Sequence, residues 1–419
     1  MHSPKRSIWY RFLLLSLLLF LLLPNLQMPA LAQAIVTNAS VEYAFGEQIT
    51  FLATVESPHP IEKAFILFAV SGEGQTRSGE LQVTPQDGTT YQLTYSQSLA
   101  NQPLRAFAQI DYRFQIRLQN GDEFTSSQFS FYYQDNRFDW QHLEKPPFNL
   151  AWYGQDDIAF GDNALQTAQA GLKKIQSIIP IKAPEKIDIY IYPNSSTLQE
   201  ALVLGGEEWV AGHADPDLGV MLAAIPSRPE QTLVMEQIIP HELMHILLYE
   251  TLEDGYNNQP IWLVEGLASV AELYPNPDYQ LLLNNAVERD TLLSIASLCE
   301  AFPRDASSAL LAYAQSASFT RYLHQQYGAS GLEQLMQSYT DGLDCGRGAE
   351  VALGSSLEQL ERQWREEVLG EDRAGAAVQN LLPWLVIAFM VLIAPASLVL
   401  NRLIHKSEPS VSEKEFLKR

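Results

Sequence analysis

Between residues 34 and 135, apolar and polar side chains alternate along several short segments, which is the pattern of β-strands buried on one face. One predicted strand places four apolar side chains on the same face: Ile49, Phe51, Ala53 and Val55. Segments 91–95 and 110–116 alternate in the same way, and Asn120-Gly121 after the second of them predicts a hairpin. We therefore predict an immunoglobulin-like β-sandwich over residues 34–135.

A change of periodicity follows a linker predicted over residues 135–147. Apolar residues over 165–179 recur every three or four positions, which predicts an amphipathic helix that Pro180 ends. The next segments are predicted as a strand, a helix, a strand and a helical half, over residues 187–191, 195–204, 219–225 and 229–368. This order predicts an α+β domain, which we place at residues 139–370.

Apolar runs also lie near both ends of the chain. Basic residues, the apolar run 12–23 and the small residues ALAQA follow one another, which predicts a signal peptide over 1–32, cleaved after Ala32. The uncharged run 381–400 has the length of a transmembrane helix. Basic residues follow this run and acidic residues precede it, so the tail 401–419 is predicted to be cytoplasmic. The sequence thus predicts a single-pass membrane protein with the α+β domain outside the cytoplasm.

Composition narrows the possible partners. The net charge is −22, and no basic patch interleaved with aromatic residues is present, so nucleic acid is not an expected partner. The chain contains two cysteines, Cys299 and Cys345. In an oxidising compartment they predict one disulfide, and two unrelated buried thiols are the alternative.

Candidate chemistry appears in the apolar segment IIPHELMHILL, residues 238–248. On a helix, His241 and His245 project from one face one turn apart, so both imidazoles can bind one metal ion. Glu242 is rotated away from that face and can act as a general base toward water. Pro240 must either open this helix or kink it.

A third ligand is expected downstream, in PIWLVEGLASVAE, residues 260–272. Glu265 lies in an apolar helix, where a carboxylate is costly unless it is paired or binds a metal. Glu272 lies two turns further along and could accept a hydrogen bond from a ligand histidine, or it could be an ordinary exposed glutamate.

These motifs resemble the gluzincin zinc metallopeptidases. HELMH followed by WLVEGLA resembles thermolysin-like and aminopeptidase N-like enzymes, and residues 139–368 are similar to the peptidase MA-like family. The resemblance implies one Zn²⁺ bound by His241, His245 and Glu265, with Glu242 as general base. It also implies that Tyr313, in AYAQSASFTRYL, stabilises the oxyanion, with Tyr322 as the other candidate and a core tyrosine as the alternative reading.

The resemblance predicts a zinc metallopeptidase that hydrolyses peptide bonds. Peptide substrate is expected to pair with the edge of the predicted strand near 219–223. Val264 replaces the asparagine common in the aminopeptidase motif, so recognition of a free substrate amine is not implied. The alternative is a non-catalytic adhesion or sensing module on a retained metallopeptidase scaffold.

Overall fold

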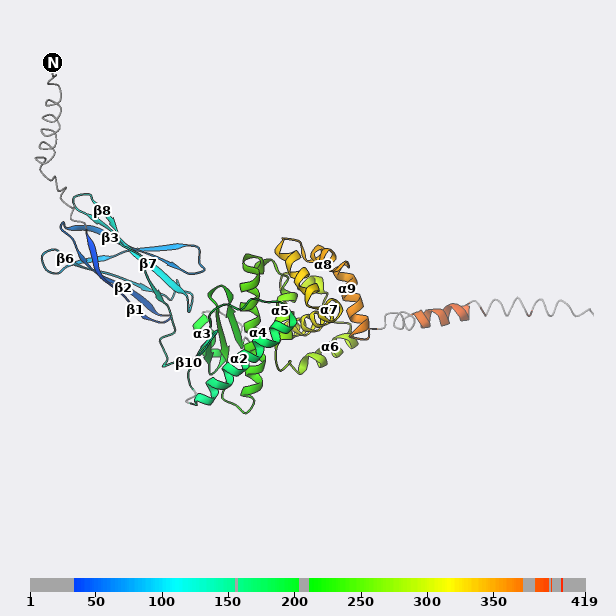
Figure 1. The fold of residues 1–419 in the computed structure, drawn as a ribbon. Helices are drawn as coiled ribbons and strands as arrows, with labels where there is room; N and C mark the ends of the chain where they lie inside the picture. Colours follow the sequence, from blue (N-terminus) through cyan, green and yellow to red (C-terminus); the bar gives the residue numbers. More distant parts are fainter. Residues whose placement is uncertain are drawn as a thin grey trace, which may run out of the picture. The chain divides into compact units, whose positions relative to one another are not determined.

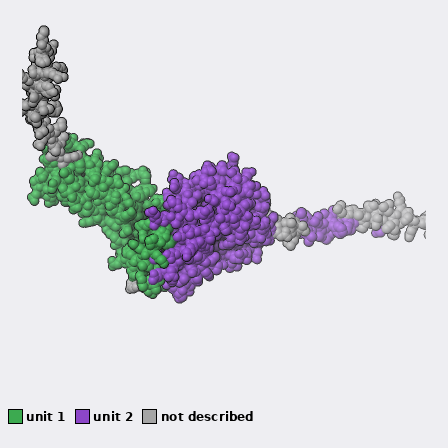
Figure 2. Space-filling model, viewed as in Figure 1, with its two compact units in different colours: residues 1–161, 186–227 green, residues 162–185, 228–419 purple. Residues whose placement is uncertain are grey.

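The computed structural model describes residues 34–154, 157–202, 211–371, 381–391, 393 and 401. They belong to two compact units, one of residues 1–161 and 186–227 and the other of residues 162–185 and 228–419 (Figure 2). The predicted signal peptide over 1–32 lies outside the described residues, as does the predicted tail apart from residue 401.

The first unit contains two antiparallel sheets (Figure 1). Their strand orders are β1-β2-β6-β5 and β4-β3-β7-β8, with β9 also paired to β7. The bounds are β1 Ile35–Ala44, β2 Gln48–Glu56, β3 Ile61–Val70, β4 Thr76–Glu80, β5 Gln82–Pro85, β6 Thr90–Ser98, β7 Gln109–Leu118, β8 Glu123–Thr125 and β9 Phe129–Tyr132. Phe51 of the first sheet packs against Phe68 and Tyr112 of the second, with ring centroids 5.1 and 5.2 Å apart. The two sheets therefore share one core, and the predicted strands and the hairpin between β7 and β8 are confirmed.

A third sheet in this unit has the strand order β10-β11-β12-β14-β13. Its elements are β10 Gln141–Lys145, β11 Phe148–Trp152, β12 Ile187–Tyr192, β13 Gly212–Asp215 and β14 Val220–Ala224, with α3 Ser195–Leu202 and η1 Pro216–Leu218 in the connections. Strand β12 has a parallel neighbour on each side and is largely buried, which explains its apolar run. Strand β14 is paired on both sides, so the expected edge pairing of a peptide to residues 219–223 is wrong, because β13 occupies that edge.

The predicted linker over 135–147 is also wrong, because this segment contains β10 and part of the core. Asp135 is fully buried and accepts hydrogen bonds from Arg137 at 2.8 Å and from the Tyr192 hydroxyl at 3.0 Å. The Trp140 indole N–H donates to the Asp135 carbonyl oxygen at 2.7 Å. A buried carboxylate is tolerated where it is paired and hydrogen-bonded, so the polar residues that suggested a linker serve packing instead.

The second unit is helical, as the periodicity after residue 229 predicted. It contains most of α2, Ile158–Ile178, and the elements α4 Gln231–Leu252, η2 Glu253–Asn258, α5 Ile261–Ala271, α6 Asp278–Arg289, η3 Ile295–Leu298, α7 Ala306–Thr340, α8 Cys345–Leu353 and α9 Leu357–Glu367. Helix α2 ends just before Pro180, which has no backbone N–H with which to continue it.

The prediction of a membrane-spanning helix over 381–400 is wrong. Among the residues that the structure describes, no helix is both long and apolar enough to cross a bilayer. The fold class is corrected accordingly, and so is the single-pass membrane localisation that rested on this helix.

Candidate metal centre

Helix α4 supplies both histidines and the candidate base from one buried segment. His241 and His245 lie one turn apart, with ring centroids 5.3 Å apart. Glu242 is only 7% exposed, so its carboxylate lies within the protein interior rather than in bulk water. Within the largely buried segment 238–248 of this helix, all the other residues are apolar, so these polar side chains are exceptional there.

Pro240 lies inside α4, which begins at Gln231, so the proline does not open the helix. Because proline has no N–H, the carbonyl oxygen of Glu236 has no partner one turn along the helix. That oxygen instead accepts a hydrogen bond from the backbone N–H of Leu273 at 2.8 Å, just beyond the end of α5. Gly171 of α2 faces the ring of Pro240, where an added Cβ would lie only 3.0 Å from the ring. The hydrogen bond from Leu273 to Glu236 thus links α4 to the end of α5, and Gly171 allows α2 to pack closely on Pro240.

Glu265 reaches the histidines from α5. Its Oε2 atom lies 3.4 Å from Nε2 of His241 and 3.8 Å from Nε2 of His245, and one donor atom from each residue lies within 4.8 Å of the others. Two ligand atoms each about 2.0–2.1 Å from one ion lie about 3.3 Å apart in a tetrahedral site. The separations and the donor types, two imidazoles and one carboxylate, therefore fit a small divalent metal ion with a further coordination position open.

Close packing against α7 fixes the position of α5. Gly266, next to the candidate ligand, faces α7, where an added Cβ would lie 2.1 Å from the Thr320 hydroxyl and 2.6 Å from the Ser316 carbonyl oxygen. The buried indole of Trp262 packs on Phe319 of the same helix, with ring centroids 5.1 Å apart. The tryptophan and the glycine flanking the glutamate are therefore the residues that let α5 pack on α7.

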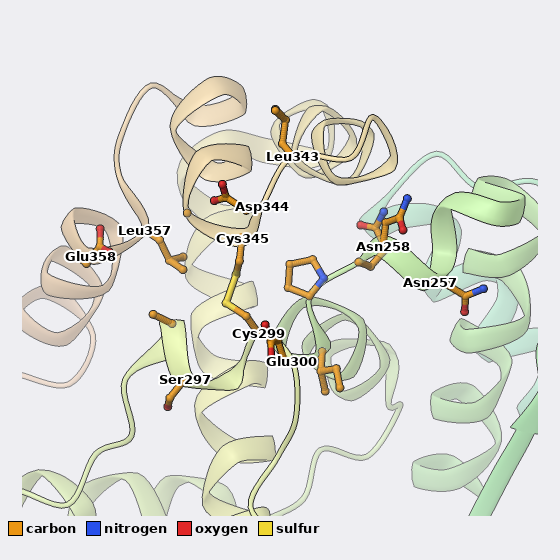
Figure 3. A pocket seen from close by; sticks show the side chains of 15 residues that line it. Asn257, Asn258, Ser297, Cys299, Glu300, Leu343, Asp344, Cys345, Leu357 and Glu358 are labelled. Atoms are coloured by element: carbon orange, nitrogen blue, oxygen red, sulfur yellow. A yellow bond between two sulfur atoms is a disulfide. The ribbon is translucent and has the colours of Figure 1, made fainter.

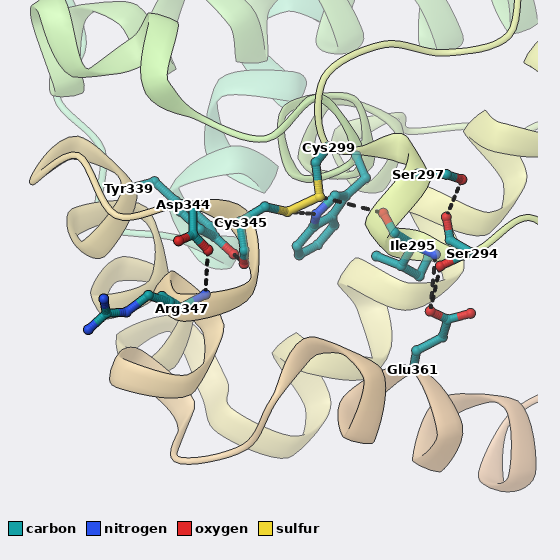
Figure 4. Close-up of a disulfide and its surroundings, with 10 residues drawn as sticks. Ser294, Ile295, Ser297, Cys299, Tyr339, Asp344, Cys345, Arg347 and Glu361 are labelled. Atoms are coloured by element: carbon teal, nitrogen blue, oxygen red, sulfur yellow. Dashed lines mark hydrogen bonds between the residues drawn. A yellow bond between two sulfur atoms is a disulfide. The ribbon is translucent and has the colours of Figure 1, made fainter.

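The start of α5 is also attached to a disulfide between Cys299 and Cys345 (Figure 4). The carbonyl oxygen of Cys299 accepts from the N–H of Ile261, and the sulfur of Cys345 accepts from the indole N–H of Trp262. The disulfide joins residues 46 positions apart, for which the chain-entropy model gives a stabilisation of about 4 kcal/mol. This crosslink thus stabilises the element that carries Glu265.

A pocket of about 850 Å³ lies beside this disulfide and the first residues of α5 (Figure 3). Side chains of Asn257, Glu300 and Asp344 are among those that line it. None of His241, His245 and Glu265 lines this pocket, so it is distinct from the metal-ligand cluster.

The outer nitrogens of both imidazoles have polar partners. Nδ1 of His241 lies 3.2 Å from Oε1 of Glu272, and Nδ1 of His245 lies 3.1 Å from the hydroxyl of Tyr256. Such partners can accept the Nδ1 hydrogen of an imidazole that binds a metal through Nε2. The structure therefore brings Glu272 to the cluster, where it is 5% exposed, and adds Tyr256, which no sequence motif indicated.

The close approach of imidazoles and carboxylates shifts the pKa values of His241 and Glu265 in opposite directions. Burial alone would lower the pKa of His241, but its hydrogen bonds to Glu265 and Glu272 raise that pKa well above the usual value. Burial alone would raise the pKa of Glu265, but the neighbouring His245 and His241 lower it. Glu265 is therefore held in its ionised form, which is the form that binds a metal ion.

The two candidate tyrosines occupy different environments on α7. The ring of Tyr313 is partly exposed and lies 6.3 Å from the ring of His241, with Phe302 perpendicular to it at 5.0 Å. Tyr322 is 4% exposed and stacks on Phe319, within the packing around Trp262. Of the two, Tyr313 is the tyrosine beside the metal-ligand cluster.

The structure thus brings together two histidines of α4 that lie one helical turn apart and a carboxylate from α5, with Glu242 between the histidines in the sequence. Residues 167–370 match the model of the Peptidase MA superfamily.

Among solved structures, the chain is similar to native yeast LTA4 hydrolase, with 11% identity and a TM-score of 0.38, over 80% of this chain and 67% of the yeast chain. It is also similar to Legionella pneumophila aminopeptidase A, with 11% identity and a TM-score of 0.38, over 79% of this chain and 49% of the other. The chain thus spans about two thirds of the first enzyme and about half of the second. No curated protein matches the sequence.

Proposed function

We propose that this protein is a zinc-dependent metallopeptidase in which His241, His245 and Glu265 hold one Zn²⁺. The observation that carries the proposal is the convergence of two imidazole nitrogens and one carboxylate oxygen within 4.8 Å, with Nδ1 of each imidazole beside a polar partner. Two nitrogen ligands and one oxygen ligand with an open position are typical of catalytic zinc, whereas structural zinc sites favour cysteine ligands and a closed shell.

Bound zinc would polarise the scissile carbonyl group and lower the pKa of a water molecule. Glu242 then accepts a proton from the attacking water and passes it to the leaving amine nitrogen, so one carboxylate serves first as base and then as acid. Glu272 and Tyr256 hold the two imidazoles in the orientation that metal binding requires.

The Tyr313 hydroxyl is assigned to the developing oxyanion. Tyr313→Phe is expected to lower kcat for a peptide about 10²- to 10³-fold with little change in KM, since the lost hydrogen bond forms only in the transition state. Tyr322→Phe, which removes a hydroxyl from the same helix within the Phe319 packing, is the matched control and is expected to keep kcat. Steady-state kinetics on both variants checks this, and equal kcat values for the two would contradict the assignment.

Hydrolysis of a quenched fluorescent peptide library tests the proposed function itself. The full chain is expected to cleave peptides, to lose this activity after dialysis against a chelator and to regain it with one equivalent of Zn²⁺. A chain that binds zinc but cleaves no peptide in the library would favour the non-catalytic adhesion or sensing module. Activity unaffected by complete metal removal would contradict the zinc assignment.

A further inference from the structure

The structure assigns to Tyr256 the role of positioning residue for His245, a role that rests on the proposed zinc site. Tyr256 belongs to η2, the short segment that follows α4. Its hydroxyl lies 3.1 Å from Nδ1 of His245, while Nε2 of the same imidazole lies 3.8 Å from Glu265. A ring that binds a metal through Nε2 carries its hydrogen on Nδ1, so His245 donates and the phenol oxygen accepts.

The backbone around Tyr256 is held in place independently of His245. Gly255 faces Thr340 of α7, where an added Cβ would lie 2.5 Å from the Thr340 side chain. The buried amide of Gln259 donates to the carbonyl oxygens of Gly255 at 3.0 Å and Met336 at 3.1 Å and to the Thr340 hydroxyl at 3.1 Å. These contacts attach both sides of Tyr256 to the end of α7, so its hydroxyl is a fixed acceptor to which the imidazole aligns.

The two candidate ligand histidines therefore have partners of different charge. His241 has the carboxylate of Glu272, whereas His245 has a neutral phenol. With Glu242 and Glu265 already nearby, a second carboxylate behind His245 would add negative charge to the site and offset more of the charge of the ion. The tyrosine fixes the tautomer and the ring orientation without that addition, so it supports metal binding while leaving the ion a stronger Lewis acid.

Tyr256→Phe in the full chain tests this role, because it removes the acceptor and keeps the ring that packs on Tyr249, 5.8 Å away. Tyr249→Phe, which removes a hydroxyl from the neighbouring ring, is the matched control. Zinc affinity is measured by competition with a chromophoric chelator, and the site geometry by the visible absorption spectrum of the cobalt-substituted protein. For Tyr256→Phe we expect zinc binding about 10- to 100-fold weaker than for the wild type and an altered cobalt spectrum.

Zinc affinity and a cobalt spectrum that match those of Tyr249→Phe would overturn the role of Tyr256 and leave the proposed function intact. A wild-type chain that binds no zinc would overturn both. A wild-type chain that binds zinc without cleaving peptides would overturn the proposed activity alone, and the zinc affinity of Tyr256→Phe would still decide the positioning role.

Discussion

Glu242→Gln is expected to lower kcat for peptide hydrolysis by about 10²- to 10⁴-fold, the usual contribution of a general base. Glutamine has nearly the same shape but cannot accept and return a proton at neutral pH. The residue lies beside the ligands on α4 without belonging to the group of donor atoms, so zinc content is expected to stay at one ion per chain. Steady-state kinetics together with metal analysis of the purified variant checks both parts.

Glu250→Gln provides the control on the same helix. Glu250 lies further along α4 and pairs with Lys182 at 2.9 Å, a partly exposed contact of small energetic weight. This variant is expected to keep wild-type kcat and zinc content. If Glu242→Gln also turned over at the wild-type rate, proton transfer by Glu242 would be disproved even with the metal in place.

Glu265→Ala is expected to weaken zinc binding by at least about 100-fold. Loss of a residue that only hydrogen-bonds to a metal ligand already lowers metal affinity about 10- to 100-fold, and loss of a ligand should lower it further. Loss of the carboxylate leaves two imidazoles, and a zinc site with two protein ligands is incomplete. Activity is expected to fall with zinc occupancy. Competition with a chromophoric chelator gives the affinity directly.

The matched control for this variant is Glu288→Ala, which removes an exposed carboxylate from α6. Zinc affinity close to that of the wild type is expected for this control. Retention of tight, stoichiometric zinc by Glu265→Ala would show that the third ligand is another group and would require a different site.

Much of the candidate site could be predicted from the sequence because its residues lie in short motifs whose spacing alone indicates their arrangement. The spacing of His241 and His245 fixes their common helix face, and Glu265 is recognisable as a carboxylate within an apolar helix. The helical half and the strands of the sandwich were predictable for the same reason, since periodicity reports which face of an element is buried. Cys299 and Cys345 were the two cysteines available, and they are joined by a disulfide.

Features that depend on contacts between distant segments were not predictable. The hydroxyl of Tyr256 reaches His245 because Gln259 attaches η2 to α7, and no local spacing encodes that attachment. Pro240 predicted either the start of the helix or a kink. The structure places it inside α4, where the backbone N–H of Leu273 donates to the carbonyl oxygen of Glu236 that the proline leaves without a helical partner. Residues 135–147 had the composition of a linker, yet they contain the buried Asp135, which pairs with Arg137, and strand β10 of the third sheet.

The central claim is that one zinc ion is bound by His241, His245 and Glu265. The most direct test is a crystal structure of the zinc-loaded protein with anomalous diffraction recorded at the zinc absorption edge. The account predicts a single strong peak at about 2.0–2.2 Å from Nε2 of both histidines and from a carboxylate oxygen of Glu265. A peak at any other position, or no peak among these three side chains in zinc-saturated crystals, would contradict it.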